Sequence, residues 1–425
     1  MKSIDKRQTG IDLGTQPQSP WRHHWSLDPN ITFLNHGSFG ACPIAVLEQQ
    51  QIFRQQLEAE PLRFFEDAYE PLLDRSRERL AEFIGTTPQE LVFVPNTTTG
   101  VNTVLRSLSL RAGDELLTTN HEYNACRNAL DFIAERSGAT VVVAEVPFPL
   151  ASAEQVITAV MSQVSDKTRI VLLDHITSQT GLIFPIQSIA QQLRGSGVDV
   201  LVDGAHAPGM VALNLKELGV TYYTGNCHKW LCAPKGAAFL YVSEAKQSLI
   251  RPLVISHGAN SVRTDRSRFH LEFDWTGTDD PTAYCCVASA VEFMDSLLPG
   301  GWNAVIERNH QMAIRARQLL CHALSMSPPC PDTLVGSMAA IPLPGKLASG
   351  VQRQLFDRFQ IEVPLIPWQR VFGQGKADSF VGELQSNALI RISAQLYNSL
   401  ADYDRLAEAL LTLLAESASS QPKPV

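Results

Sequence analysis

Seven short β-rich runs alternate with helical patterns between residues 91 and 242, and this alternation restricts the chain to an α/β fold. The runs are Leu91–Val94, Glu115–Thr119, Thr140–Val143, Arg169–Leu173, Val198–Val202, Thr221–Tyr223 and Ala238–Val242. Several are apolar without alternation, which is typical of strands that are covered on both faces. The pattern therefore predicts a large domain with a mostly parallel seven-stranded sheet covered by helices.

The sequence also predicts a second, smaller domain. A chain of 425 residues should form two or three lobes. After Pro299-Gly300-Gly301 the pattern changes to one long helix, at about 302–324, followed by short strands and further helices. We expect an N-terminal arm over residues 1–30, the large domain over 31–298 and a smaller C-terminal α/β domain over 299–425.

Charge and hydropathy narrow the class of partner. The chain has 35 Lys and Arg against 43 Asp and Glu, a net charge of −8, and no long basic run. This balance argues against nucleic acid or an anionic membrane as the partner and favours a small molecule. No run approaches the roughly 18 apolar residues that a membrane span requires, and the first residues lack a signal-peptide core. We expect a soluble, cytoplasmic protein.

The cysteine pattern predicts neither a disulfide framework nor a metal site. The eight cysteines include no C-x-x-C pair, and His23-His24 has no partner pair at zinc-binding spacing. We interpret the cysteines as free thiols, buried or partly exposed.

The segment after the first run suggests a phosphate site. Asn96-Thr97-Thr98-Thr99-Gly100 comes directly after this strand and opens a helix. Free backbone N–H groups, hydroxyls and the positive end of a helix dipole would meet there, as anion binding requires. An ordinary helix cap is the alternative interpretation.

A carboxylate and a lysine follow two later runs. Asp203 follows the run that ends at Val202, and Lys229 follows the run that ends at Tyr223, 26 residues after Asp203. In a parallel sheet both would lie at the ligand-binding edge with the phosphate site. Taken singly, they could be a helix cap and a solvated lysine. Together they match the needs of pyridoxal phosphate (PLP): a lysine for the Schiff base, an acid for the ring nitrogen and a phosphate site. Neither G-x-G-x-x-G nor G-x-x-x-x-G-K-[ST] occurs.

These segments resemble the class V aminotransferase family of PLP enzymes, fold type I. The resemblance lies in residues 203–209 (Asp-Gly-Ala-His-Ala-Pro-Gly) and 225–236 (Gly-Asn-Cys-His-Lys-Trp-Leu-Cys-Ala-Pro-Lys-Gly). Residues 33–40 (Phe-Leu-Asn-His-Gly-Ser-Phe-Gly) resemble the isopenicillin N epimerase-like branch. The similarity runs from about residue 30 to 410, with the motifs in family order.

The resemblance implies a set of cofactor-binding residues. Lys229 would form the Schiff base, Asp203 would pair with the ring nitrogen, and His206 would contact the phenolic oxygen. Tyr123 would stack on the ring, where many relatives carry His, and Ser178 would lie near the phenolic oxygen. The residues implied for the phosphate are Thr97, Thr98, His228 and, from a partner subunit, Thr278. The family pattern thus implies a homodimer with its active sites at the interface, and no metal.

The resemblance also implies how the substrate is held. Arg391, in Arg391-Ile392-Ser393, would bind the substrate carboxylate, and Asn35 and His36 would lie beside the substrate. A guanidinium can bind a carboxylate through two parallel hydrogen bonds. An isolated surface ion pair is the alternative for this arginine. Substrate specificity is expected from loops 36–40, 257–275 and 365–380.

The expected activity is chemistry at the α carbon of an amino-acid-type substrate, with an epimerase or racemase as the first interpretation. The alternatives are a carbon–sulfur lyase for cysteine, cystine or a sulfoxide, and an aminotransferase. Desulfurases of the usual kind carry a reactive cysteine in the C-terminal lobe, and this chain has none after Cys330. A catalytically silent binding protein is disfavoured because Lys229, Asp203 and the threonine loop are all present.

Overall fold

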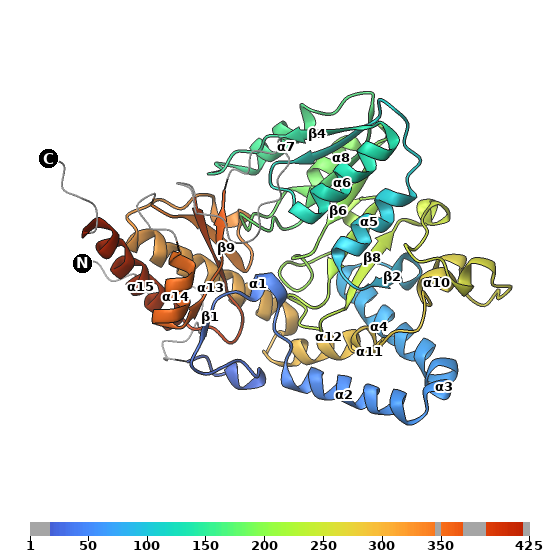
Figure 1. The fold of residues 1–425 in the computed structure, drawn as a ribbon, viewed down its shortest axis with the longest axis horizontal. Coiled ribbons are helices and arrows are strands. Elements are labelled where there is room, and N and C mark those ends of the chain that lie inside the picture. Colours follow the sequence, from blue (N-terminus) through green and yellow to red (C-terminus); the bar gives the residue numbers. More distant parts are fainter. Residues whose placement is uncertain (1–17, 345–349, 369–387, 420–425) are drawn as a thin grey trace.

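The computed structural model describes residues 18–344, 350–368 and 388–419. Figure 1 shows a larger lobe built around one sheet and a smaller lobe that holds the C-terminal helices. No helix in these described ranges is both long enough and apolar enough to cross a membrane.

The large lobe contains the predicted seven-stranded sheet, and all seven strands lie where the sequence indicates. They are β2 (Leu91–Val94), β3 (Glu115–Thr119), β4 (Thr140–Ala144), β5 (Thr168–Asp174), β6 (Asp199–Asp203), β7 (Tyr222–Asn226) and β8 (Ala238–Val242). Their spatial order is β2-β8-β7-β6-β5-β3-β4. Only β8 runs antiparallel to its neighbours β2 and β7 in this sheet. The fold prediction is confirmed.

Both faces of the sheet are buried, which explains the apolar runs. Ile170 and Leu172 of β5 pack into one hydrophobic cluster, whereas Val171 and Leu173 pack into another. Successive side chains of a strand point to opposite faces, so a strand between two helical layers needs an apolar residue at every position. The helices of this lobe are α2 (Ile44–Ala59), α3 (Pro61–Arg63), α4 (Tyr69–Ile84), α5 (Thr97–Ser107), α6 (Asn124–Ser137), α7 (Ala153–Met161), α8 (Ile186–Leu193), α9 (Leu215–Leu218), α10 (Arg268–Phe273), α11 (Thr282–Cys285) and α12 (Val287–Ser296).

The smaller lobe packs helices against a three-stranded antiparallel sheet. This sheet has the order β11-β12-β9. Its elements are α13 (Gly301–Ala323), β9 (Met338–Pro342), α14 (Val351–Phe359), β11 (Leu365–Pro367), β12 (Ala388–Ser393) and α15 (Leu400–Ser419). The expected long helix is therefore α13, which begins at the last glycine of the Pro299-Gly300-Gly301 segment. Part of the predicted specificity loop 365–380 lies outside the described residues.

The N-terminal segment differs from the predicted division at residue 31. Strand β1 (Thr32–Phe33) pairs in parallel with β10 (Ile361–Glu362) of the smaller lobe. The backbone N–H of Leu34 donates to the carbonyl of Glu362 at 2.9 Å. These hydrogen bonds hold the segment on the smaller lobe, and α1 (His36–Phe39) then leads the chain across to α2.

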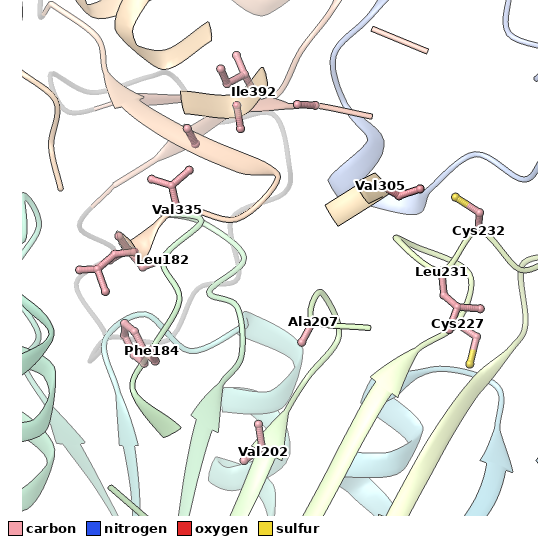
Figure 2. Close-up of a cluster of buried hydrophobic side chains, with 14 of the residues drawn as sticks. Leu182, Phe184, Val202, Ala207, Cys227, Leu231, Cys232, Val305, Val335 and Ile392 are labelled. Carbon is pink, nitrogen blue, oxygen red and sulfur yellow. The ribbon is translucent and has the colours of Figure 1, made fainter. Parts of the chain in front are cut away.

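A hydrophobic junction joins the two lobes. Leu182 forms an antiparallel bridge with Val335, and the N–H of Ile183 donates to the carbonyl of Leu334 at 2.9 Å. Figure 2 shows Leu182 near Val335, with Ile392 of β12 on the side of the smaller lobe. The junction fixes β12 close to the carboxyl ends of the large sheet.

Candidate active site

The predicted functional residues gather at the carboxyl ends of neighbouring strands. Helix α5 begins three residues after β2, Asp203 is the last residue of β6, and Lys229 lies in the turn after β7. Because β2, β6 and β7 run in the same direction, these positions share one edge of the sheet.

Lys229 contacts an imidazole whose tautomer its neighbours determine. The lysine Nζ lies 3.2 Å from Nε2 of His206, and the indole Nε1 of Trp230 donates to Nδ1 of His206 at 3.4 Å. An indole N–H can only donate, so Nδ1 accepts and the neutral ring carries its proton on Nε2. Burial, reinforced by the charge of Lys229, holds the pKa of His206 well below its usual value. In this tautomer the Nε2–H of His206 can donate to the lysine nitrogen when that nitrogen is uncharged.

Burial makes Lys229 a usable base. It lowers the pKa of the lysine from its ordinary value to about 8, and the nearby carboxyl of Asp203 opposes part of this shift. A lysine in this range can release its proton near neutral pH and take it back. Lys235, the competing lysine, instead donates from Nζ to the carbonyl of Gly40 at 3.0 Å.

Asp203 is buried, with an exposed fraction of 3%, and each of its oxygens accepts a hydrogen bond. Oδ1 accepts from the backbone N–H of Ala205 at 3.0 Å, and Oδ2 accepts from the thiol of Cys126 at 3.0 Å. Burial raises the pKa of Asp203, whereas these two donors and the charge of Lys229 lower it. A cation beside this carboxyl would favour its ionised form further.

The start of α5 has the features of an anion site. The Thr97 hydroxyl is buried and has no hydrogen-bond partner within the described ranges. The backbone N–H of Thr97 donates to Oδ1 of Asn226, and Asn96 caps the helix through the N–H of Thr99. Thr98 is partly exposed beside them. A hydroxyl and the N-terminal dipole of an eleven-residue helix suit a phosphate.

His228 lies next to the lysine with one ring nitrogen engaged. Its Nδ1 donates to the carbonyl of Ala237 at 3.1 Å, since a carbonyl can only accept. Burial, with the charge of Lys229, lowers its pKa to about 4. An anion at the other ring nitrogen would raise the pKa of His228. The contact of His228 with a phosphate stays a prediction.

Tyr123 is the N-cap residue of α6, and its side chain is partly accessible to solvent. Its exposed fraction is 42%, and it directly precedes the helix. Burial of the rest of the ring raises its pKa, as do Cys126 and Asp203, whereas Arg391 lowers it. Tyr123 therefore lies within electrostatic reach of both the acid and the arginine of the site.

Arg391 lies on β12 of the smaller lobe and reaches the large lobe. Its Nη1 donates to the carbonyl of Ser178, and its Nη2 donates to Oγ of Ser38 at 3.0 Å. Ser38 in turn donates to Oδ1 of Asn35 at 2.5 Å. Burial lowers the pKa of Arg391 to about 10, and no carboxylate pairs with it in the described part of the chain. A buried guanidinium of this kind suits the carboxylate of a small molecule.

Two predicted residues lie away from the lysine nitrogen. Both ring nitrogens of His36 are engaged: Nδ1 with the Tyr397 hydroxyl at 2.8 Å, and Nε2 with the backbone carbonyl of Lys229 at 3.0 Å. The buried ring of His36 thus contacts the backbone of the lysine turn, and its contact with a substrate stays a prediction. Thr278 lies in an exposed loop after Trp275, and its side chain is open to solvent in the single chain. Its predicted role depends on a second subunit.

Three residues that organise this site were not predicted from the sequence. Cys126 bonds to Asp203, Asn226 holds the start of α5, and Ser38 links Arg391 to Asn35. Asn226 could have been found, since it directly precedes the Cys-His-Lys segment and lies three residues after the predicted run that ends at Tyr223. Cys126 carried no such signal in the sequence.

The observed groups fit PLP. The partnerless hydroxyl of Thr97 suits its phosphate, the buried carboxyl of Asp203 suits a protonated ring nitrogen, and the Nε2–H of His206 suits its phenolic oxygen. Lys229 contacts His206, and the carboxyl of Asp203 is close enough to raise the pKa of the lysine.

Comparisons with known proteins agree with this arrangement. The family model for aminotransferase class V matches residues 40–406. The chain is 34% identical to the isopenicillin N epimerase of Amycolatopsis lactamdurans, over 92% of this chain and 97% of that protein. It is 29% identical to a probable chloroplastic L-cysteine desulfhydrase of Arabidopsis thaliana, over 94% and 86% of the two chains. Among solved structures, the cystine C–S lyase C-DES superposes with a TM-score of 0.73 at 22% identity, covering 90% of this chain and 98% of that one.

The match of the family model extends from Gly40 to Leu406 and so includes both lobes and every residue placed at the sheet edge. The likeness to C-DES extends over both lobes and shows the same fold. This protein therefore belongs to the class V aminotransferase family, whose members are PLP-dependent enzymes of fold type I.

Proposed function

We propose that this class V enzyme inverts the configuration at the α carbon of an amino acid, or of an amino-acid side chain within a peptide. Two features support an epimerase. Isopenicillin N epimerases of two organisms are 34% and 32% identical to the chain over nearly their whole length. The chain also has no cysteine after Cys330, where a desulfurase of the usual kind carries its reactive thiol.

The observation that carries chemistry at the α carbon is the presence of a buried base and a buried carboxylate-binding group at one edge of the sheet, and the epimerase relatives favour inversion as its outcome. Lys229 has its pKa lowered to about 8, and Arg391 reaches the same sheet edge from the other lobe. PLP, when bound, supplies a ring that accepts the electron pair of a broken bond at the α carbon. Arg391 would bind the substrate carboxylate, and Lys229 would remove the α proton.

Inversion requires a second group that returns a proton to the opposite face. We assign this role to the hydroxyl of Tyr123, which the family resemblance places over the ring, away from Lys229. Burial raises the pKa of Tyr123, so its hydroxyl keeps a proton at neutral pH, and its exposed edge lets solvent restore that proton. A general acid must lie within hydrogen-bond reach of the α carbon or of a bridging water.

A carbon–sulfur lyase is the second candidate. The desulfhydrase relatives and the fold of C-DES favour it, because the same base and the same carboxylate clamp would serve both reactions. The two candidates differ in the product: an epimerase keeps every bond to the β carbon, whereas a lyase releases sulfide or a persulfide.

The purified enzyme should exchange the α proton of productive substrates with D₂O and interconvert their configurations, without accumulating pyruvate, keto acid or sulfide. Amino acids, cysteine, cystine and sulfoxides would be screened by chiral chromatography and mass spectrometry. In Tyr123→Phe, which keeps the ring, we expect exchange from one enantiomer to persist while inversion falls about 100-fold or more. Stoichiometric pyruvate or sulfide, without exchange into recovered substrate, would replace the epimerase with the lyase.

We also propose a homodimer in which Thr278 completes the partner's phosphate site. Large apolar side chains are exposed on two segments, 39–62 and 253–262, and an interface with a second subunit would bury such side chains. They are Phe39, Leu47, Ile52, Leu62, Leu253, Val254, Ile255 and Val262. The family pattern assigns the exposed loop that contains Thr278 to such an interface. In a homodimer, each subunit would contribute this loop to the phosphate site of the other.

Subunit mixing tests this arrangement. Thr278→Asp should lose most activity, because a carboxylate would repel the phosphate, and Lys229→Ala should be inactive. Co-expression of the two variants should restore activity, since one site of the mixed dimer would contain native Lys229 from one chain and native Thr278 from the other. A monomer in sedimentation measurements, or mixed dimers as inactive as the parents, would contradict the proposal.

A further inference from the structure

Three carboxyl groups lie together beneath the proposed ring site. Asp174 and Asp203 are register partners at the ends of the parallel strands β5 and β6, so their side chains point to the same face. Glu122 follows β3, the other neighbour of β5. All three are buried, with exposed fractions of 0 to 3%. One polar atom each from Glu122, Cys126 and Asp203 lie within 4.8 Å of one another.

Such a cluster holds one charge more readily than three. Burial and mutual repulsion raise the pKa values of Glu122 and Asp174 well above their usual range. The pKa of Asp203 is raised less, because the Cys126 thiol, the N–H of Ala205 and the charge of Lys229 all favour the ionised form of this carboxyl. Like charges this close rarely ionise together.

The hydrogen bonds distribute the protons in the same way. The Thr118 hydroxyl lies 2.8 Å from Oε2 of Glu122 and 3.1 Å from the carbonyl of Leu172. A hydroxyl has one proton, so if it donates to the carbonyl, it accepts from a protonated Glu122. Oε1 of Glu122 and Oδ2 of Asp174 are buried without a partner in the described chain, as suits neutral acids better than carboxylates. Both oxygens of Asp203 accept from donors.

We propose that Cys126 is a positioning residue for Asp203: its thiol donates to Oδ2 and keeps the single negative charge of the cluster on that residue, while Glu122 and Asp174 stay neutral. The thiol holds its proton, because burial and the adjacent carboxyls raise its pKa well above the usual value. The inference rests on the proposed role of Asp203 at the ring nitrogen. It assigns a function to one of eight buried cysteines.

Infrared spectroscopy of the S–H stretch tests the contact without any catalytic assay. The difference between the native and Cys126→Ala spectra isolates this thiol, and its band should lie at low frequency because the acceptor is charged. Asp203→Asn should shift the band up, whereas Glu122→Gln should leave it in place, since that side chain is neutral in both forms. The proposal would be overturned if the S–H frequency stayed the same in Asp203→Asn, or if it shifted in Glu122→Gln. So would stoichiometric zinc that Cys126→Ala abolishes.

A matched pair of variants tests the consequence for the enzyme. Cys126→Ala should lower kcat about tenfold with little change in KM, the loss expected for one hydrogen bond to a charged group. Cys126→Ser keeps a donor and should restore kcat to within about threefold of native. Equal losses in both variants would mean that Cys126 only fills space. If the S–H band behaves as stated but the products are those of a lyase, the epimerase proposal fails and this one stands.

Discussion

Replacing Lys229 with alanine should remove both the colour of the purified protein and its activity. A native protein that holds PLP on this lysine is yellow, and borohydride should fix the cofactor to the peptide that contains Lys229. A positioned general base contributes about 10²- to 10⁴-fold to a rate, so loss of the lysine should lower turnover at least that much. Visible absorbance and peptide mass spectrometry after borohydride treatment measure the result.

Lys235→Ala is the matched control, since Lys235 lies six residues later and donates to the carbonyl of Gly40. It should keep the colour and the same modified peptide. Cofactor trapped on Lys235 in the Lys229→Ala protein would show that the Schiff-base lysine is wrongly assigned.

Asp203→Asn should keep the fold and lose most of the activity. A neighbouring carboxylate raises the pKa of a cation by roughly 1 to 3 units, and each unit is tenfold in the protonated fraction. A neutral amide gives up this effect, so kcat should fall roughly 10- to 1,000-fold. Steady-state kinetics measure the loss, and circular dichroism checks the fold.

Asp199→Asn is the control on the same strand. Asp199 begins β6 at the opposite end from Asp203 and pairs with Lys246 at 2.9 Å. It should change kcat little, because it lies at the other edge of the sheet. Near-native turnover in Asp203→Asn would mean that the ring nitrogen has no need of this carboxylate.

The large sheet was predictable because its chemistry is local. Strands such as β5, with a buried residue on each face, require unbroken apolar runs that loops and surface helices rarely contain. Asp203 and Lys229 were predictable for a related reason, since Asp203 directly follows such a run and Lys229 lies in the turn after the next predicted strand. The spacing of strands thus determined both the fold and the residues at its edge.

The contacts between distant segments were not predictable. Nothing in the two residues of β1 indicates that they pair with β10, more than 300 positions away in the chain. The thiol of Cys126 contacts Asp203 only because α6 packs beside the end of β6, which is a property of the assembled lobe. The two hydrogen bonds of His36 were not predictable for the same reason, as both partners come from other parts of the chain.

The bonds of Arg391 and His36 span almost the entire chain. Arg391 bonds to Ser38 across 353 positions, and His36 bonds to Tyr397 across 361. During synthesis, a nascent chain can complete the sheet and the lysine turn long before β12 has left the ribosome. The proposed carboxylate site at Arg391 can form only when the first and last parts of the polypeptide meet. We therefore expect a chain truncated before β12 to contain Lys229 but to lack this proposed site.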